Sequence, residues 1–436
     1  MSARNRELLA LVPASLLLTA GFAAIFIQQS DALSDVSLTY GAVFLGLCLA
    51  GHLVIRFTLP YADPYLFPLV AVLACFGLVV IYRLDEDLAR EQAQWFVVGL
   101  VVFAATIVFL RDFRVLERYR YTVAAAGLLL LLLPRVPGIG QQVNGAYLGV
   151  NLGPISFQPA EFGKIAIVVF LAAYLRDTRQ VLVLGARRFL GVTIPPLKHF
   201  GPLLVVWGGA MVMLVFIRDL GSSLMFFGGF LALLYVATNR LSFVTIGLAM
   251  FGVGAWFFAT TVGHIQDRIA TWQDPFDPQL YDKPGGSYQI AQALFAQADG
   301  GLFGTGFGQA TLNLPTGQSI LPAPHTDLIY AVITNELGLA GACGLLLVYL
   351  LFIERGFATA VRAQDSFSKL LATGLTAVFA LQVFVIVGGV TKVIPLTGVT
   401  LPFVSYGGSS ILANFVLLAL LLLVSERARR EAEMPA

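Results

Sequence analysis

Three acidic side chains that could accept a proton stand close together in a polar stretch of an otherwise apolar chain. Asp274, Asp277 and Asp282 lie in the run Trp272-Gln-Asp-Pro-Phe-Asp-Pro-Gln-Leu-Tyr-Asp-Lys-Pro-Gly-Gly-Ser-Tyr288. A carboxylate within hydrogen-bond reach of a hydroxyl can act as general base when that hydroxyl attacks. Acids in a polar loop are also commonly just solvated, so the residues alone leave both interpretations open.

A second polar group opens an apolar segment, in Phe157-Gln-Pro-Ala-Glu-Phe-Gly-Lys164. Pro159 suits a helix start, and Glu161 and Lys164 stand three residues apart, so the two can pair on one helix face. Ionisable groups at membrane depth are costly and tend to mark function. Either the pair only joins helices, or Lys164 lines a cavity that accepts a lipid-linked pyrophosphate, with Glu161 and Gln158 as further candidate substrate contacts.

A third group is the tripeptide His325-Thr-Asp327, which precedes another apolar run. Thr326 or Asp327 could cap the helix that follows, and Asn335 and Glu336 lie two turns further on. His325 has no second His or Cys at ligand spacing, which argues against a zinc site. We expect His325 to form hydrogen bonds at the mouth of a cavity, and His325, Thr326 and Asp327 to be candidate contacts for a substrate there.

The fourth group is Pro395-Leu-Thr-Gly-Val-Thr-Leu-Pro-Phe-Val-Ser-Tyr-Gly-Gly-Ser-Ser410, where Pro, Gly and hydroxyl residues interrupt an apolar pattern. Irregular backbone at membrane depth is tolerated only where it is buried in protein or lines a cavity. Ser405, Tyr406 and Ser409 are therefore candidate contacts for a substrate.

Three further features carry weaker signals. The Gly-rich run Gly300–Gly308 is either a tight packing turn or a phosphate cradle, because glycine permits positive φ and close backbone approach. The segment Tyr288–Gln297 has apolar residues at helical spacing and predicts an amphipathic helix on the membrane face. Arg218 and Asp219 form either an interfacial turn or a buried ion pair.

The elements that must position these residues are membrane helices. The chain has 436 residues, of which 58% are hydrophobic and 12% charged, and a spanning helix needs about 20 apolar residues. Twelve runs approach that length, which predicts an all-α, polytopic helix bundle; they are Leu8–Ile27, Tyr40–Leu59, Pro64–Tyr82, Trp95–Leu110, Thr122–Leu133, Ala160–Leu175, Gly201–Ile217, Gly221–Thr238, Phe243–Val262, Asp327–Ile353, Lys369–Gly389 and Pro402–Val424. The short fifth run and the charges near the sixth and eighth make eleven spans an alternative.

The distribution of basic residues predicts the orientation. Short cytoplasmic loops collect Lys and Arg, and twelve spans with a cytoplasmic N terminus place most of the basic loops inside. The polar segment 264–324 then lies outside, and both termini are cytoplasmic. The first run could instead be a signal peptide, although it is as long as a true span. With a net charge of +2 and no basic face, nothing indicates nucleic acid.

These clusters, in this order, resemble the SEDS family, which includes RodA, FtsW and SpoVE. The likeness runs from about Pro64 to Arg430 and is carried by four motifs: Gly398-Val-Thr-Leu-Pro-Phe-Val-Ser-Tyr-Gly-Gly-Ser-Ser410, Gln158-Pro-Ala-Glu161 with Lys164, His325-Thr-Asp327, and Asn335-Glu-Leu-Gly338. The resemblance implies a ten-helix core over residues 63–430, with two additional N-terminal helices in residues 1–62 and a cytoplasmic tail at 431–436.

The resemblance also implies an activity. Family members polymerise lipid II into β-1,4-linked glycan and release undecaprenyl pyrophosphate, and they use an essential Asp in the outside loop. Pyrophosphate departure needs positive charge, from Lys164, another basic group or a divalent cation such as Mg or Mn. We expect a class B penicillin-binding protein, a transpeptidase, as partner within the elongation or division machinery of the bacterial inner membrane, with a slight preference for the RodA-like branch.

The family pattern does not assign the essential acid uniquely. Counting from Trp272 selects Asp277 and keeps its Asp-Pro dipeptide, whereas counting back from Tyr288 selects Asp282, because the intervening gap is longer here than in the family. Asn144-Gly-Ala-Tyr147 also lacks the family's usual Arg-Trp pair. A lipid II flippase and a non-catalytic scaffold remain alternatives, although paired half-helices or an internal repeat, which would favour a transporter, are not evident.

Overall fold

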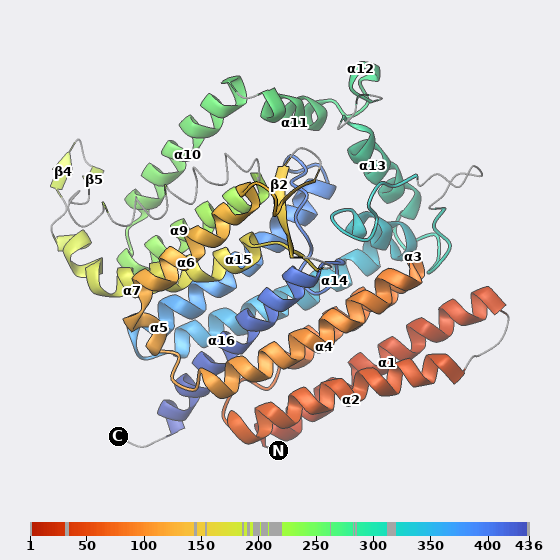
Figure 1. Ribbon diagram of the computed structural model, residues 1–436, viewed down its shortest axis with the longest axis horizontal. Helices are drawn as coiled ribbons and strands as arrows, with labels where there is room; N and C mark the ends of the chain where they lie inside the picture. Colours follow the sequence, from red (N-terminus) through yellow and green to blue (C-terminus); the bar gives the residue numbers. More distant parts are fainter. Residues whose placement is uncertain are drawn as a thin grey trace.

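The protein is a bundle of long helices that run roughly side by side (Figure 1). The computed structural model describes residues 2–433 except 31–34, 144–145, 153–154, 185–186, 190–191, 195–200, 202–207, 209–219, 262, 282, 284–285 and 312–319. Nine helices in this described part are long and apolar enough to cross a bilayer: α1 (Ala3–Ser30), α2 (Asp35–Thr58), α3 (Leu66–Leu84), α4 (Glu86–Phe109), α9 (Leu220–Thr238), α10 (Leu241–Thr261), α14 (Ile329–Arg362), α15 (Ser366–Val390) and α16 (Gly408–Glu433).

Each of the nine overlaps an expected run. Two further runs are helical as α6 (Arg120–Leu132), which follows the short α5 (Val115–Arg118), and α7 (Ala160–Leu184). The run Gly201–Ile217 lies almost wholly outside the described residues. The mostly helical membrane bundle is thus confirmed, while twelve spans and cytoplasmic termini stay predictions.

Helices α15 and α16 form the centre of the bundle. About four-fifths of each of their apolar spans is buried, 78% in α15 and 83% in α16, against 6% in α10. Helix α16 packs on α4, α14, α15 and α7, and α15 packs on α14, α9 and α7. Within the connection between these two helices, residues 401–405 are buried, and they belong to the motif at residues 398–410.

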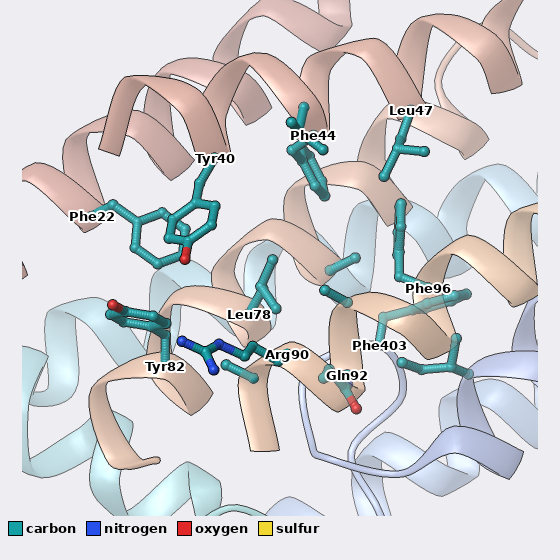
Figure 2. A pocket seen from close by; sticks show the side chains of 15 residues that line it. Phe22, Tyr40, Phe44, Leu47, Leu78, Tyr82, Arg90, Gln92, Phe96 and Phe403 are labelled. Carbon is teal, nitrogen blue, oxygen red and sulfur yellow. The ribbon is translucent and has the colours of Figure 1, made fainter. Parts of the chain in front are cut away.

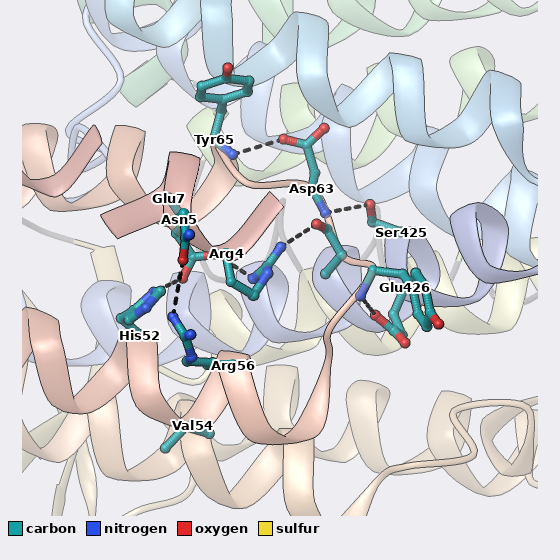
Figure 3. A network of polar contacts seen from close by, with 12 residues as sticks. Arg4, Asn5, Glu7, His52, Val54, Arg56, Asp63, Tyr65, Ser425 and Glu426 are labelled. Carbon is teal, nitrogen blue, oxygen red and sulfur yellow. Dashed lines mark hydrogen bonds and ion pairs between the residues drawn. The ribbon is translucent and has the colours of Figure 1, made fainter. Parts of the chain in front are cut away.

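The two N-terminal helices pack on one side of this centre, α1 against α3 and α2 against α4. Buried polar groups fasten them. Arg4 donates hydrogen bonds to Glu7 and to the Ala62 carbonyl, and Nδ1 of His52 lies 2.7 Å from Oε1 of Glu7. Since Ala62 belongs to the α2–α3 connection, these contacts tie the start of α1 to the core (Figure 3).

The C-terminal helix ends at the same place. The fully buried Asp63 accepts hydrogen bonds from Arg355 at 2.6 Å and from Arg429, and the Tyr61 amide donates to Glu426 at 2.7 Å. Both termini therefore lie at one end of the bundle, the terminal end. We call Arg4, Glu7, His52, Asp63, Arg355 and Arg429 the terminal network.

The opposite end, the loop end, carries the polar segment predicted at 264–324. It holds α11 (Gly263–Gln273), α12 (Pro278–Tyr281) and α13 (Tyr288–Gly300). The expected amphipathic helix is α13, which buries Ile290 and Ala291 and packs on α14 and α15. It covers the ends of two core helices.

The Gly-rich run fits into a break in α14. Gly338 has φ of 65° inside this helix, and the amide of Leu339 donates to the Gly301 carbonyl at 3.0 Å, while that of Gly306 donates to Glu336 at 3.1 Å. A Cβ added to Gly304 would lie 2.1 Å from the Glu336 carbonyl oxygen. Close backbone packing, the first of the two interpretations, accounts for these glycines.

Short strands join some helices, which an all-α prediction does not include. One antiparallel sheet, in the order β1 (Gly140–Val143), β2 (Ala146–Leu152), β3 (Ile155–Phe157), follows the 3₁₀ turn η1 (Leu133–Arg135) and leads into α7. A hairpin of β4 (Arg187–Phe189) and β5 (Val192–Ile194) follows α7.

Candidate functional site

The α15–α16 loop, residues 391–407, is the framework of the candidate site. Residues 401–405 are buried without being helical or extended, so their backbone groups need partners from side chains. The side-chain amide of Gln382 donates to the Thr400 carbonyl at 2.9 Å. The Tyr349 hydroxyl donates to the Pro402 carbonyl at 2.6 Å, and the side-chain amide of Gln92 donates to the Ser405 carbonyl at 3.0 Å. The predicted irregular segment is thus buried in protein, and side chains of α15, α14 and α4 hold its shape.

The His325-Thr-Asp327 motif docks on this loop. The Ser405 hydroxyl donates to the Thr326 carbonyl at 2.6 Å, and the Tyr406 amide donates to the His325 carbonyl at 2.8 Å. The rings of His325 and Tyr406 also meet edge to face, with centroids 5.8 Å apart. The structure therefore brings together two motifs that helices α14 and α15 separate in the sequence.

Asp327 faces the loop and does not cap α14. The N-cap position is Leu328, without a side-chain hydrogen bond, so the capping prediction was wrong; the Thr326 hydroxyl instead donates to Asp327 at 3.0 Å. A Cβ added to Gly398, whose φ is 71°, would lie 3.9 Å from Oδ2 of Asp327. Burial raises the pKa of Asp327, and the Thr326 hydrogen bond and the positive charge of Arg268 oppose that shift.

Glu161 and Lys164 form a buried ion pair, as their spacing predicted. Nζ of Lys164 lies 2.6 Å from Oε2 of Glu161 and 2.6 Å from Oε1 of Gln382. Lys164 is 2% and Glu161 3% exposed, so the ammonium is enclosed by its partners. Because Gln382 also holds the Thr400 carbonyl, the pair supports the α15–α16 loop. A direct contact with substrate stays a prediction for both residues.

The backbone of Gln158 contacts the side chain of Ser409. The Gln158 amide N–H donates to the Ser409 hydroxyl at 2.9 Å, which joins the start of α7 to the start of α16. Gln158 is half-buried. The contact fixes the register of two motif segments at the loop end.

Tyr406 links the loop to α4. Its hydroxyl donates a hydrogen bond to Glu91, and burial, together with this carboxylate, raises the pKa of Tyr406 above its usual value. The adjacent Gln92 accepts from the Gly407 amide at 3.2 Å. Burial lowers the pKa of His325, so its imidazole is neutral at pH 7.

The segment that carries the loop acids is anchored on the same framework. The indole N–H of Trp272 donates to the Lys392 carbonyl at 3.0 Å, and Nη1 of Arg268 donates to the Leu396 carbonyl at 2.9 Å. Nζ of Lys392 donates back to the Gln273 carbonyl at 3.3 Å. Helix α11 is thereby held against the α15–α16 loop, and Asp277 follows five residues after Trp272.

Asp277 directly precedes the short helix α12. Its Oδ1 accepts the backbone N–H of Gln279 at 2.9 Å, which fixes the carboxylate while leaving it partly exposed. Asp274 makes a similar local contact with the Phe276 amide at 3.2 Å. Asp282 lies outside the described residues, as do Arg218, Asp219 and Asn144, so their predicted roles stay predictions.

Sequence reasoning overlooked two glutamines in this site. Gln92 is 3% and Gln382 is 0% exposed. Gln92 both donates to and accepts from the loop, whereas Gln382 donates to the loop and accepts from Lys164. The available signal was a lone amide within an apolar run, because a neutral polar group also needs a partner when buried.

Among the residues that the structure describes, the protein groups do not form a ready-made cage for a divalent cation. In the parts of the chain that the structure describes, no three His, Cys, Asp or Glu side chains gather as metal ligands. Mg and Mn favour several oxygen ligands, and the carboxylates of Asp327 and Glu161 are occupied by a hydroxyl and an ammonium.

The fold and the site together define a polytopic membrane protein with a polar centre built on an irregular loop at one end of its bundle. The chain belongs to the family of cell cycle proteins that comprises FtsW, RodA and SpoVE, whose model matches residues 64–430. The matched region begins after α1 and α2.

Two curated relatives illustrate the family. The peptidoglycan glycosyltransferase RodA of Mycobacterium tuberculosis is 42% identical over 439 residues, covering 98% of this chain and 91% of the relative. That alignment therefore extends over α1 and α2. Stage V sporulation protein E of Bacillus subtilis is 31% identical over 352 residues, covering 80% of this chain and 90% of its own.

Solved structures show the same fold. One is a chain from a peptidoglycan synthase complex studied for the coordination of polymerization and crosslinking, with a TM-score of 0.67 and 26% identity over 84% of this chain and 98% of that one. Another is the rod shape determining protein RodA of Thermus thermophilus, with a TM-score of 0.59 and 26% identity over 86% of this chain and 98% of that one.

Proposed function

We propose that this protein is a peptidoglycan glycosyltransferase that polymerises lipid II into β-1,4-linked glycan strands and releases undecaprenyl pyrophosphate. The relatives named RodA and FtsW carry that activity in their names. The observation that carries the proposal in this chain is the anchoring of α11, through Trp272 and Arg268, on the α15–α16 loop. This contact fixes on the loop the helix that precedes the partly exposed carboxylate of Asp277.

Asp277 acts as general base in this reaction. The 4-hydroxyl of the acceptor sugar attacks the anomeric carbon of the donor, and its proton passes to the carboxylate as the C–O bond forms. The bond from the anomeric carbon to the pyrophosphate breaks, and the leaving group keeps the electron pair. The backbone N–H of Gln279 holds Oδ1 in place, which orients the carboxylate for the transfer.

Basic groups near the loop stabilise the departing pyrophosphate. Arg268 and Lys392 lie at the surface of the α15–α16 loop, each bonded to a backbone carbonyl there or in α11. Positive charge placed where negative charge develops lowers the barrier. Lys164 supports the loop from inside through Gln382. A divalent cation bound with the pyrophosphate would supply further positive charge there, and no step of this mechanism depends on it.

The reaction takes place at the outer face of the bacterial inner membrane, in the orientation that the basic loops predict. A class B penicillin-binding protein then crosslinks the strands in the same complex, as the likeness to a chain of a peptidoglycan synthase complex supports. The mycobacterial relative named RodA supports the elongation machinery over the division machinery.

Polymerisation of labelled lipid II by the purified protein with its transpeptidase tests the proposal. We expect glycan strands from the wild-type chain, none from Asp277→Ala, and wild-type product from the neighbouring control Asp274→Ala. Asp282→Ala distinguishes the other candidate acid. Equal melting temperatures of the variants exclude misfolding as the cause.

Two outcomes would overturn parts of this account. Loss of product in Asp282→Ala with retention in Asp277→Ala would move the base to Asp282. No product from a folded wild-type complex, with Mg or Mn supplied, would favour a flippase or a scaffold, and transport of labelled lipid II across vesicles would separate those two.

A further inference from the structure

A cavity lies between the N-terminal helix pair and the core (Figure 2). Side chains of α1, α2, α3 and α4 line it at the loop end. Its wall is almost entirely apolar and rich in aromatic rings, among them Phe22, Tyr40, Phe44, Tyr82 and Phe96. The region matched by the family model lacks α1 and α2, so the part of the wall that Phe22 and four residues of α2 form lies outside that region.

The cavity reaches inward to the candidate site. Phe403 and Ile411, each 2% exposed, form its floor, and Phe403 belongs to the α15–α16 loop. Gln92 also lines the cavity, and the same side chain binds the Ser405 carbonyl and the Gly407 amide. A ligand in the cavity would therefore contact Gln92, the side chain that holds the α15–α16 loop.

The mouth of the cavity opens on the membrane-facing surface of the bundle. Val43 on α2, which lines the cavity, is 57% exposed. Tyr40 and Tyr82 lie at the ends of their helices near the loop end, where the amphipathic rings of tyrosines sit at headgroup level. Arg90, also at the mouth, is balanced by Glu86 at 2.7 Å, so the cavity offers apolar contact and no unpaired charge among its described lining residues.

We infer that this cavity binds a single hydrocarbon chain of a membrane lipid, in the leaflet at the loop end, with the headgroup beside Tyr40, Tyr82 and Arg90. A transmembrane helix is about 10 Å wide and does not fit among these side chains, and a polar metabolite would gain nothing from an apolar wall reached through the bilayer. The bound hydrocarbon chain is part of either a bilayer phospholipid or a polyprenyl phosphate. An occupied cavity supports the Gln92 side of the α15–α16 loop.

Photo-crosslinking with the full-length protein in nanodiscs tests the inference. Two probes carry a diazirine in the chain: a diacyl phosphatidylglycerol and a polyprenyl phosphate. We expect one of them to label peptides of α2 and α4 around Val43 and Ala93. Ala93→Trp, which fills the cavity, lowers this labelling about tenfold, as a loss of roughly 1.4 kcal/mol would produce, whereas Val101→Trp on the lipid-facing side of the same helix leaves it unchanged.

A second filling variant guards against misfolding. Leu47→Trp narrows the cavity from α2, and equal loss of labelling in both filling variants, with unchanged melting temperature, assigns the effect to the cavity. Labelling spread evenly over lipid-facing helices, or unchanged in both variants, overturns the inference. The probe that labels identifies the lipid. Because the readout is binding, its failure is independent of whether the protein polymerises lipid II.

Discussion

Both ends of the bundle bury polar side chains, but they bury different kinds. At the terminal end, Asp63 lies between Arg355 and Arg429, and Glu7 lies between Arg4 and His52. These charged groups join the ends of regular helices to one another. Their role is structural, and the contacts of Arg4, Glu7 and His52 hold α1 and α2 on the core.

At the loop end, neutral amides and hydroxyls hold backbone carbonyls of an irregular segment. Gln92 and Gln382 together bind three backbone groups of the α15–α16 loop, and Glu161 and Lys164 lie behind Gln382. Burial alone therefore does not separate structural from functional polar groups. What separates them is whether they fix helix ends or shape a loop at a site.

The largest expected effect is on stability at the terminal end. Asp63→Asn leaves the guanidinium groups of Arg355 and Arg429 without their buried carboxylate, and breaking such a pair costs about 3–5 kcal/mol. We expect a marked fall in melting temperature of the detergent-solubilised protein. Glu354→Gln is the control, because Glu354 lies 3.8 Å from Arg355 but is 58% exposed, and exposed pairs contribute about 1 kcal/mol or less. Equal falls in the melting temperature of the two variants would contradict the structural role of Asp63.

A smaller loss of stability, with loss of activity, is expected at the loop end. Gln382→Leu leaves the Thr400 carbonyl without its donor and Lys164 without one acceptor; an unsatisfied buried group costs about 1–3 kcal/mol. We expect lower polymerisation of lipid II per folded molecule, because the α15–α16 loop loses its support. Gln273→Leu, at an exposed position of α11, should leave both quantities unchanged. Full activity in Gln382→Leu would show that this amide does not shape the site.

The smallest expected effect is a pH dependence at Asp327. Burial raises the pKa of its carboxyl, so between the unfolded value of about 3.9 and the raised native value the folded state binds more protons than the unfolded state. The stability contributed by Asp327 is therefore present at low pH and is lost as pH rises through the native pKa. The substituted side chain in Asp327→Asn does not titrate. The melting temperature of this variant, relative to that of the wild type, should therefore rise from pH 4 upwards. The raised pKa would be contradicted if the melting temperature of Asp327→Asn minus that of the wild type stayed constant or fell as the pH rises.

Much of the bundle was predictable because apolar runs of spanning length leave few alternatives to a helix. Every described spanning helix overlaps such a run, and the irregular segment at 398–410 was expected from its Pro, Gly and hydroxyl residues. The contacts of Ser405 with Thr326, and of Gln158 with Ser409, could not be read from spacing. They depend on the packing of α16 between α4, α7 and α14, which no local pattern determines.

The errors have local causes. Capping by Asp327 was plausible from its position before an apolar run, but the carboxylate turns to the Thr326 hydroxyl and to Gly398. Gln92 and Gln382 were overlooked because attention to ionisable groups passes over neutral amides. Asp63 was overlooked because it falls in a connection between two helices, where an acid is usually solvated, and only the tertiary structure brings two arginines to it.

One paired measurement tests the contrast between the two ends most directly. Lipid II polymerisation per folded molecule and melting temperature are measured for Asp277→Asn and Asp63→Asn side by side. We predict that Asp277→Asn abolishes polymerisation with an unchanged melting temperature, whereas Asp63→Asn lowers the melting temperature and keeps the activity of the molecules that remain folded. Polymerisation by a folded Asp277→Asn protein, together with an inactive but fully stable Asp63→Asn protein, would contradict the account.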